Sequence, residues 1–192
     1  MKELAQSDRQ QLLALARAAV EAAARRDPKP ALDPPALTPG LLAPAAAFVT
    51  IHEHGELRGC IGMMRFDVAL WENVREAAAA AALDDPRFLP IAESELPALE
   101  LEVSVLDPLV ELRDPAEFVA RRHGIVVERD GRRALLLPQV AAEMGWDAGQ
   151  MLEAVCRKAH LPGHAWQDAA TRLYVFESTC YLERGPTEPA SR

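Results

Sequence analysis

The sequence predicts an α+β fold in which helices flank a largely antiparallel sheet. Two stretches, residues 12–23 and 70–81, repeat apolar residues with the period of a helix. The β-compatible segments group as hairpins, and they do not alternate with helices as the strands of a parallel sheet do. With 192 residues, of which 49% are hydrophobic, the chain can fill one core or divide into a larger and a smaller subdomain.

The first helix is predicted to begin at Ser7, which has capping-box spacing to Gln10. Its apolar stripe consists of Leu12, Leu15, Ala16, Ala19, Val20 and Ala23. Residues 27–44 are rich in proline, which fixes φ and removes hydrogen-bond donors. We therefore expect a Pro-rich connector over residues 27–44 that lies extended on the surface and does not separate independent domains.

A hairpin is predicted next. Residues 45–52 are β-compatible, residues 53–56 can form a tight turn, and residues 57–63 return as the partner strand. A second helix follows, capped by Asp67. It is expected to end at Asp85-Pro86, because proline disfavours helical geometry in the residue before it.

Polar and apolar residues alternate over 100–105, which predicts a strand with one buried and one wet face. Asp130-Gly131 is the strongest hairpin signal in the chain. We expect residues 125–128 and 133–137 to pair across it.

Two short helices are expected after this hairpin. The first begins at Pro138, and the second begins at Asp147 and stops at residues 161–163. Residues 173–182 are predicted to form one last strand, and residues 184–192 a polar, mobile tail.

Composition excludes several classes of protein. Acidic residues outnumber basic ones 29 to 21, and the net charge of −8 argues against a general nucleic-acid surface, although a local basic patch stays open. No apolar run approaches the roughly 18 residues of a membrane span, and no signal peptide is visible. The odd set Cys60, Cys156 and Cys180, without CxxC spacing, predicts reduced thiols in a cytoplasmic protein.

The common motifs of known chemistries do not occur. The sequence contains no GxGxxG, GxxxxGK[ST], GxSxG or HExxH. Nucleotide-loop, serine-hydrolase and zinc-metalloprotease mechanisms therefore lack their usual sequence markers, and no cofactor is predicted.

Several segments form a pattern in a fixed order. They are Gly55-Glu56-Leu57-Arg58-Gly59-Cys60-Ile61-Gly62, Asp85-Pro86-Arg87-Phe88, Leu101-Glu102-Val103-Ser104-Val105-Leu106, Leu137-Pro138-Gln139-Val140, and the run from Cys156 through Lys158-Ala159 to Leu161-Pro162 and Trp166. In this order and spacing, the chain from about residue 45 to residue 182 resembles the AMMECR domain family, called AmmeMemoRadiSam system protein A in bacteria.

The resemblance implies a single AMMECR-type domain over residues 1–192, built as a two-subdomain α+β fold. It also implies a genomic association with a Memo-like protein and a radical-SAM enzyme, which are therefore the expected partners. It supplies no reaction. His160 stands where the family usually has Gly, and a residue with a Cβ bears the cost of a positive φ that Gly avoids.

The strand Arg58-Gly59-Cys60-Ile61-Gly62 is the candidate working surface. Glycines weaken a strand and often mark a close backbone approach, so we interpret Gly59 and Gly62 as room for a ligand. Arg58 can hold a carboxylate or phosphate, and Cys60 shares its face by the two-residue period, where the cation would lower the thiol pKa. The predicted ligand-binding residues are Arg58, Gly59, Cys60, Gly62 and Arg87.

Three functions fit these residues. The first is a module that binds a small anionic ligand or a partner segment and acts with the Memo-like and radical-SAM proteins. The alternative is an enzyme in which Cys60 is the catalytic nucleophile and Arg58 positions an anionic substrate. In the third, a purely structural scaffold, Cys60 is a small buried hydrophobic residue and Arg58 is a surface ion-pair partner.

A Cys-His pair with His52 is disfavoured by the simplest hairpin. A two-residue turn places His52 opposite Leu57 and Cys60 opposite Val49, so that His52 and Cys60 lie on opposite sides of the sheet. A three-residue loop or a β-bulge would reverse this arrangement.

Other clusters are better explained without function. Cys156, His160 and His164 would share one face of an unbroken helix, but Pro162 and Gly163 interrupt it, so no metal site is predicted.

Acidic residues in two segments also have simpler explanations. Residues 84–88 are expected to form a helix-stop turn in which Phe88 packs inward and Arg87 pairs locally, in preference to a catalytic role. Glu100 and Glu102 share a strand face; paired carboxylates can raise a pKa for acid–base catalysis, but a solvated face is expected.

Overall fold

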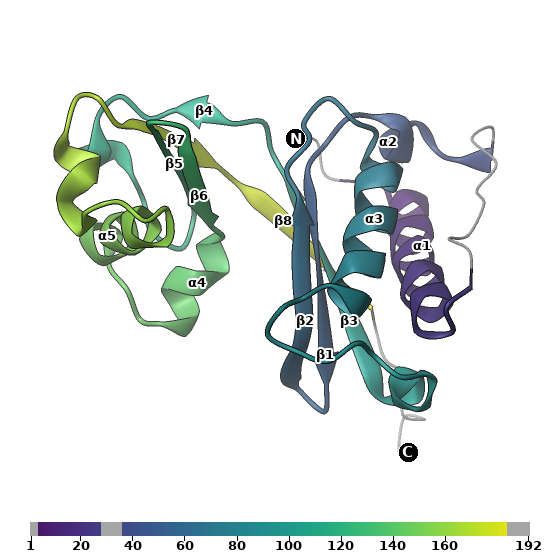
Figure 1. The fold of residues 1–192 in the computed structure, drawn as a ribbon. Coiled ribbons are helices and arrows are strands. Elements are labelled where there is room, and N and C mark those ends of the chain that lie inside the picture. Colours follow the sequence, from purple (N-terminus) through teal and green to yellow (C-terminus); the bar gives the residue numbers. More distant parts are fainter. Residues whose placement is uncertain (1–3, 28–35, 184–192) are drawn as a thin grey trace, which may run out of the picture. The chain divides into compact units, whose positions relative to one another are not determined.

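The computed structural model describes residues 4–27 and 36–183. It divides into two compact units, one formed by residues 1–106 and 179–192 and the other by residues 107–178 (Figure 1). Each unit has a hydrophobic core of its own and an antiparallel four-stranded sheet. The predicted α+β class, with a larger and a smaller subdomain on one chain, is therefore confirmed.

The first unit is built on the sheet β2-β1-β3-β8. Its strands are β1 (Ala47–Glu53), β2 (Glu56–Met63), β3 (Leu99–Leu106) and β8 (Ser178–Leu182). Strand β1 pairs antiparallel with both β2 and β3. His54 and Gly55 have φ of 53° and 81°, as a type I′ turn requires, so the predicted hairpin is confirmed.

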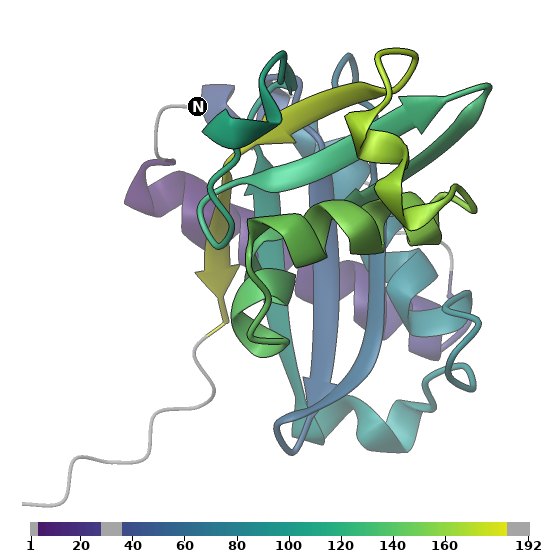
Figure 2. The same cartoon turned by 90° about the vertical axis from the view of Figure 1, so that its left-hand side faces the viewer.

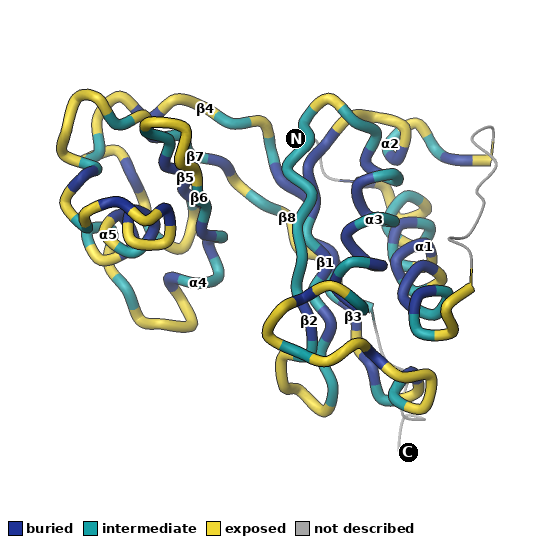
Figure 3. The backbone as a smooth tube through the Cα atoms, in the orientation of Figure 1, coloured by how far each residue is buried: buried dark blue, intermediate teal, exposed yellow. Residues whose placement is uncertain are grey.

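Two helices cover one face of this sheet. They are α1 (Gln6–Ala24) and α3 (Leu70–Leu83), and both pack against the strands as well as against each other (Figures 1 and 3). Ala47, Val49 and Ile51 of β1 are fully buried in this core. The alternate residues of β1, Phe48, Thr50 and His52, therefore lie on the other face. We call this other face of the first sheet the polar face.

Both predicted helix starts in the first unit are wrong. Helix α1 begins at Gln6 with no side-chain cap, and Ser7 lies inside its first turn. Helix α3 begins at Leu70, after the predicted cap Asp67. At the start of α3 a backbone group replaces the side-chain cap, since the Leu70 N–H donates to the Ala43 carbonyl at 2.9 Å. Such a bond between distant segments leaves no local sequence signal.

The Pro-rich connector is only partly described. Residues 28–35 lie outside the described residues, as does the predicted tail at residues 184–192. Residues Pro39–Leu42 form a short helix, α2, with proline at its first position and Leu41 fully buried. The expectation of an extended connector is therefore wrong over this part.

Later in the first unit, the 3₁₀ helix η2 (Glu93–Ala98) leads from α3 into β3. Glu95 accepts the Ala92 N–H at 2.7 Å and so caps this helix. Pro97 lies within it. Its start is thus satisfied by a side chain, whereas the start of α3 is satisfied by backbone.

The second unit is built on the sheet β4-β7-β5-β6. Its elements are β4 (Val110–Glu111), η3 (Pro115–Glu117), β5 (Gly124–Arg129), β6 (Arg132–Leu136), α4 (Pro138–Glu143), α5 (Ala148–Lys158), η4 (Gly163–Gln167) and β7 (Arg172–Phe176). Asp130 and Gly131 have φ of 50° and 74°, which confirms the predicted β5–β6 hairpin. Helix α5 packs on β5 and β6 (Figure 2).

Helix α5 has the predicted start. Asp147 accepts the Gln150 N–H at 2.8 Å, and the Gln150 side chain accepts the Asp147 N–H at 3.0 Å. At its other end His160 has a φ of 58°, and the His160 and Leu161 N–H groups bond back into the last turn. This is the Schellman pattern, which glycine usually completes.

The predicted last strand is wrong in its extent. Residues 173–182 are not one strand, because the chain leaves β7 at Phe176 and begins β8 at Ser178, in the other sheet. The break lies at Glu177, whose carbonyl accepts the Asp107 N–H at 2.9 Å. Within the described residues, no helix combines the length and apolar character needed to cross a bilayer.

Candidate functional site

A β-bulge sets the geometry of the candidate strand. The register shifts between Ile51 and His52, so that Ile51 pairs with Gly59 and His52 with Leu57, leaving Arg58 as the extra residue. Cys60 consequently pairs with Thr50 and not with Val49. The prediction that His52 and Cys60 lie on opposite faces is therefore wrong, and both lie on the polar face.

The two glycines of this strand are explained by the protein's own packing. A Cβ at Gly59 would lie 2.3 Å from the Ala81 carbonyl oxygen of α3, and a Cβ at Gly62 would lie 2.3 Å from the Phe48 ring. Gly59 lets α3 approach the helix-covered face, and Gly62 lets Phe48 lie across the polar face. Our interpretation of these glycines as room for a ligand is wrong, because helix and ring fill that space.

Cys60 is half-buried and held at both its backbone and its thiol. Its Sγ lies 3.2 Å from Thr50 Oγ1, and its N–H donates to Asp85 Oδ2 at 2.8 Å. Burial raises the pKa of the thiol, and this outweighs the Thr50 hydrogen bond and the Arg87 charge, both of which lower it. Cys60 is thus a thiol at neutral pH, contrary to the expectation of a lowered pKa.

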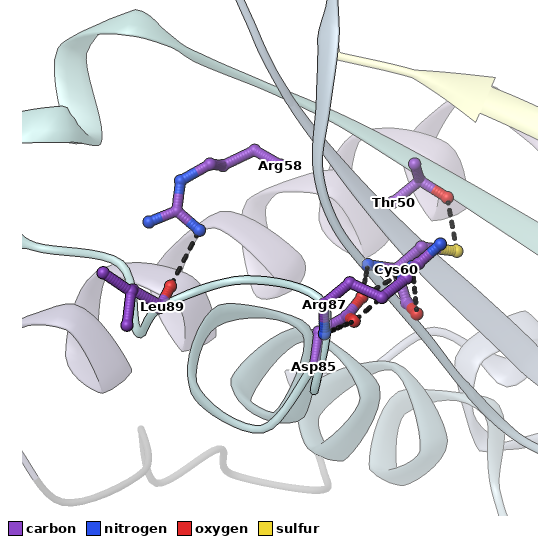
Figure 4. A network of polar contacts seen from close by, with 6 residues as sticks. All are labelled: Thr50, Arg58, Cys60, Asp85, Arg87 and Leu89. Atoms are coloured by element: carbon purple, nitrogen blue, oxygen red, sulfur yellow. Dashed lines mark hydrogen bonds and ion pairs between the residues drawn. The ribbon is translucent and has the colours of Figure 1, made fainter.

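Arg58 points away from Cys60 (Figure 4). Its guanidinium donates to both carboxylate oxygens of Glu95, at 2.7 and 3.2 Å, and to the Leu89 carbonyl at 2.8 Å. Its side chain is only 16% exposed. Arg58 therefore fastens β2 to the chain that follows α3, and the expected shared face of Arg58 and Cys60 is not found because of the bulge.

The cation beside Cys60 is Arg87. Its guanidinium grips Asp85 through Nε at 2.9 Å and Nη2 at 2.6 Å, and Nη2 also lies 3.5 Å from the Cys60 carbonyl oxygen. The Arg87 side chain is 53% exposed, whereas that of Asp85 is 2% exposed. The pair with Arg87, together with the Cys60 N–H, holds the pKa of Asp85 at about 2. Asp85 is therefore ionised at neutral pH.

Phe88 is half-buried beside the same two cations. Its ring lies under the Arg58 guanidinium at 6.0 Å and under that of Arg87 at 5.3 Å. Residues 84–88 thus form the expected local turn with an Arg87–Asp85 pair, and that turn brings Arg87 next to Cys60. The structure therefore places Cys60 and Arg87 together and leaves Arg58 on a different set of contacts.

Three further polar residues of the polar face were not among the predicted site residues. Glu102 is the β3 neighbour of Thr50, and Ser104 Oγ donates to its carboxylate at 3.3 Å. Burial of the sulfur and a hydrogen bond to Glu102 raise the pKa of Cys180 to about 12, although the residue as a whole is exposed. The alternation of residues along β3 indicates that Glu102 and Ser104 share a face. Their position beside Thr50 depends on the order of strands in the sheet, which the local sequence does not reveal.

Together these residues form a hydrogen-bonding surface. Each strand contributes one group to it: β2 the thiol of Cys60, β1 the hydroxyl of Thr50, β3 the carboxylate of Glu102 and β8 the thiol of Cys180. No Lys or Arg within the described residues pairs with Glu102. Such a surface can orient a polar ligand through several donors and acceptors, with Arg87 as the exposed cation at its border.

A half-open cavity of about 590 Å³ lies in the second unit. It is lined by residues 111–113, 166–169 and 171–173 and by Pro115. Its charges are balanced, since Arg113 lies 3.7 Å from Glu111 and Asp168 pairs with Arg129 at 2.9 Å. Size alone suits a small molecule, but these pairs select no chemical class of ligand.

Cys156, His160 and His164 do not form a cluster in the structure. Cys156 is fully buried in the core of the second unit, and burial raises its pKa. His160 is exposed in the Schellman turn and His164 in η4. No group of three or more His, Cys, Asp or Glu residues that could hold a metal ion occurs in the described part of the chain.

Known proteins resemble this chain over most of its length. The AMMECR1 family model matches residues 13–181. A protein of Caldivirga maquilingensis is 41% identical over 188 residues, covering 91% of this chain and 85% of its own, and one of Thermococcus onnurineus is 39% identical, covering 94% and 93%.

The fold also has a solved counterpart. The crystal structure of the uncharacterised protein PH0010 from Pyrococcus horikoshii superimposes with a TM-score of 0.87 at 34% identity, covering 97% of this chain and 96% of that one. None of these three relatives carries a name that states an activity. By the extent of these matches, the chain belongs to the AMMECR1 family.

Proposed function

We propose that this protein is a binding module that holds a small ligand, or a segment of a partner protein, on the polar face beside Cys60 and Arg87. The observation that supports this most directly is the row of neighbouring polar groups across four strands, in which Cys60 contacts Thr50 and Glu102 contacts Ser104 and Cys180. A sheet face that is merely solvated needs no such contacts, and here hydroxyl, thiol and carboxylate groups are already oriented towards one another.

Arg87 is the better candidate than Arg58 for contact with an anionic group. Arg58 is largely covered, and all three of its nitrogens donate to Glu95 or Leu89. Arg87 is exposed, and its Nη1 makes no hydrogen bond within the described residues. A carboxylate or phosphate oxygen would meet Arg87 at Nη1 while Asp85 keeps the guanidinium in place.

The proposed partners are the Memo-like protein and the radical-SAM enzyme. The experiment is isothermal calorimetry of this protein with each of the two, first for the wild type and then for Arg87→Lys and Arg58→Lys. We expect micromolar binding to at least one partner, weakened much more by Arg87→Lys than by Arg58→Lys. Absence of binding to both, or equal loss in the two variants, would contradict the proposal.

A second candidate function is an enzyme with Cys60 as nucleophile. One observation favours it: the bulge puts His52 on the same face as Cys60, where a base would be needed. The raised pKa of the Cys60 thiol argues against it in the free protein.

Alkylation by iodoacetamide, followed peptide by peptide against pH, separates the two functions. For the binding module, Cys60 should react only above the pH at which a free cysteine ionises, and His52→Ala should change nothing. Fast alkylation of Cys60 at neutral pH that is lost in His52→Ala would support the enzyme instead.

A further inference from the structure

Strand β2 forms one edge of the first sheet. It pairs with β1 on one side only. The Cys60 N–H donates to the Asp85 side chain and not to β1, so the peptide groups of Cys60 point away from the sheet. By the two-residue period, the peptide groups of Gly62 do the same. A row of outward N–H and C=O groups is a template on which another chain can add a strand.

The side chains of Asp85 and Arg87 occupy this edge at Cys60. Asp85 Oδ2 accepts the outward N–H at 2.8 Å, and Arg87 Nη2 approaches the outward carbonyl oxygen at 3.5 Å, the outer limit of a hydrogen bond. Asp85 thus supplies the acceptor, and Arg87 the donor, that a neighbouring strand would otherwise supply to the N–H and C=O groups of Cys60. Figure 4 shows both side chains reaching Cys60 from the turn after α3.

The pair is fixed firmly enough to act as a barrier. Asp85 and Arg87 are joined by two side-chain hydrogen bonds, and the Asp85 carboxylate also accepts the Arg87 N–H at 3.1 Å. The next residues are tied to β2 as well, through the bond from Arg58 to the Leu89 carbonyl. Together these contacts hold residues 85–89 against the Arg58–Cys60 part of the edge, whereas the outward groups of Gly62 have no hydrogen bond within the described residues.

We propose that the Asp85–Arg87 pair is an edge cap, which keeps β2 from pairing with the β2 strand of a second copy of this protein. Arg87 takes part in both proposals, but the cap concerns the edge of the sheet and is tested by amide exchange and self-association, whereas the ligand site is tested by binding, so failure of one is distinguishable from failure of the other. A turn that only ended α3 would need no contact with the peptide groups of a strand 25 residues earlier in the chain.

Amide hydrogen exchange of the wild-type protein gives the first test. The cap predicts that the Cys60 amide is protected although it lies on an edge, and that it exchanges at least about tenfold more slowly than the outward amide of Gly62. Exchange of Cys60 as fast as that of Gly62 overturns the proposal.

Self-association gives the second test. The double variant Asp85→Ala/Arg87→Ala removes the cap and leaves the formal net charge at −8, so any change is not an effect of charge. Sedimentation velocity over a range of concentrations should show dimers or larger species of the double variant at concentrations where the wild type sediments as a smaller species. In those assemblies the Gly62 amide should become protected, because the new strand bonds to it.

The matched control is Arg122→Ala/Glu177→Ala, which removes an exposed ion pair of 2.9 Å in the second unit and also keeps the net charge. It should sediment as the wild type does. If the buried Asp85 proves essential for folding, the single variant Arg87→Ala replaces the double variant, and a smaller increase in association is expected, because Asp85 still accepts the Cys60 N–H and the net charge falls from −8 to −9. A folded cap variant that sediments like the wild type overturns the proposal.

Discussion

Asp85 is the residue on which the candidate site depends most. It is almost fully buried and negatively charged, and three groups compensate that charge: the Cys60 N–H, the Arg87 N–H and the Arg87 guanidinium. A buried carboxylate with this set of partners is stable, but loss of the Arg87 side chain would leave its charge uncompensated. Asp85 thus links β2 to the turn after α3, and a change there alters both.

The first prediction concerns the acid stability that Asp85 provides. Its pKa in the folded protein is about 2, below the usual 3.8, so between these values the unfolded state binds more protons. The stabilisation of about 2 kcal/mol is complete above about pH 5 and is lost as the pH falls towards about 2. Urea unfolding of the wild type and Asp85→Asn should therefore show a difference in stability that shrinks with acidification.

Asp84→Asn is the control for this series, because Asp84 is the exposed neighbour in the same turn. It should change the unfolding free energy little at any pH. A difference between the wild type and Asp85→Asn that stays constant from neutral pH down to about pH 2 would show that the carboxylate does not carry the stabilisation.

At the scale of elements, the residues predict which segments pair but not how they align. The β1–β2 hairpin follows from Gly55 and the flanking β-compatible residues. The bulge at Arg58, however, reverses which residues between His52 and Arg58 share a face of the sheet with Cys60. The bulged residue Arg58 forms an ion pair with Glu95, which lies 37 positions later. A contact between such distant segments leaves no trace in local periodicity, which is why the Arg58–Cys60 relationship was predicted wrongly.

The glycines of β2 give a prediction at this scale. Gly59→Ala places a methyl group against the Ala81 carbonyl of α3, so the helix must move away from the sheet. Overpacking of this kind costs about 1–3 kcal/mol, and rigid backbone puts Gly59→Ala at the upper end. Gly62→Ala meets the ring of Phe48, a half-buried side chain that can turn, and should cost less.

Chemical denaturation of both variants measures the two costs. The double variants with Phe48→Leu separate the causes: the smaller side chain should relieve Gly62→Ala and leave the cost of Gly59→Ala unchanged. Equal relief of both, or no cost for Gly59→Ala, would mean that α3 does not press on the strand as described.

The end of helix α5 gives a second prediction for an element. His160 holds a φ of 58° in the Schellman turn, where a residue with a Cβ costs about 1–2 kcal/mol that glycine does not. Part of this gain is lost in the glycine variant, because glycine increases the conformational entropy of the unfolded chain. We therefore expect His160→Gly to stabilise the protein by about 0.5–1 kcal/mol in thermal or urea unfolding, and His160→Ala to give no gain. Stabilisation by both variants would assign the effect to loss of the imidazole instead of relief of φ.

At the scale of the whole molecule, the chain leaves the first unit after β3 and returns to it in β8. Residues 173–182 contain no proline or glycine that would stop a strand, so the sequence predicts one strand there. The structure divides it at Glu177: before the break Leu173 and Val175 pack in or against the core of the second unit, and after it Tyr181 packs in the core of the first. Which core a β-compatible residue joins is decided by tertiary packing, and a single sequence does not contain that information locally.

The separate cores lead to the last prediction. Leu101 of β3 and Leu152 of α5 are each almost fully buried, one in each core. Truncation of either to Ala should cost about 2–5 kcal/mol through lost burial and a cavity. Since Leu101 packs only in the core of the first unit and Leu152 only in that of the second, each substitution should destabilise mainly its own unit. Hydrogen exchange should accelerate mainly in residues 107–178 for Leu152→Ala and mainly in residues 4–106 for Leu101→Ala. Equal acceleration throughout the chain in both variants would instead mean that the two cores unfold as one cooperative body, and the division into two units would then describe geometry without describing stability.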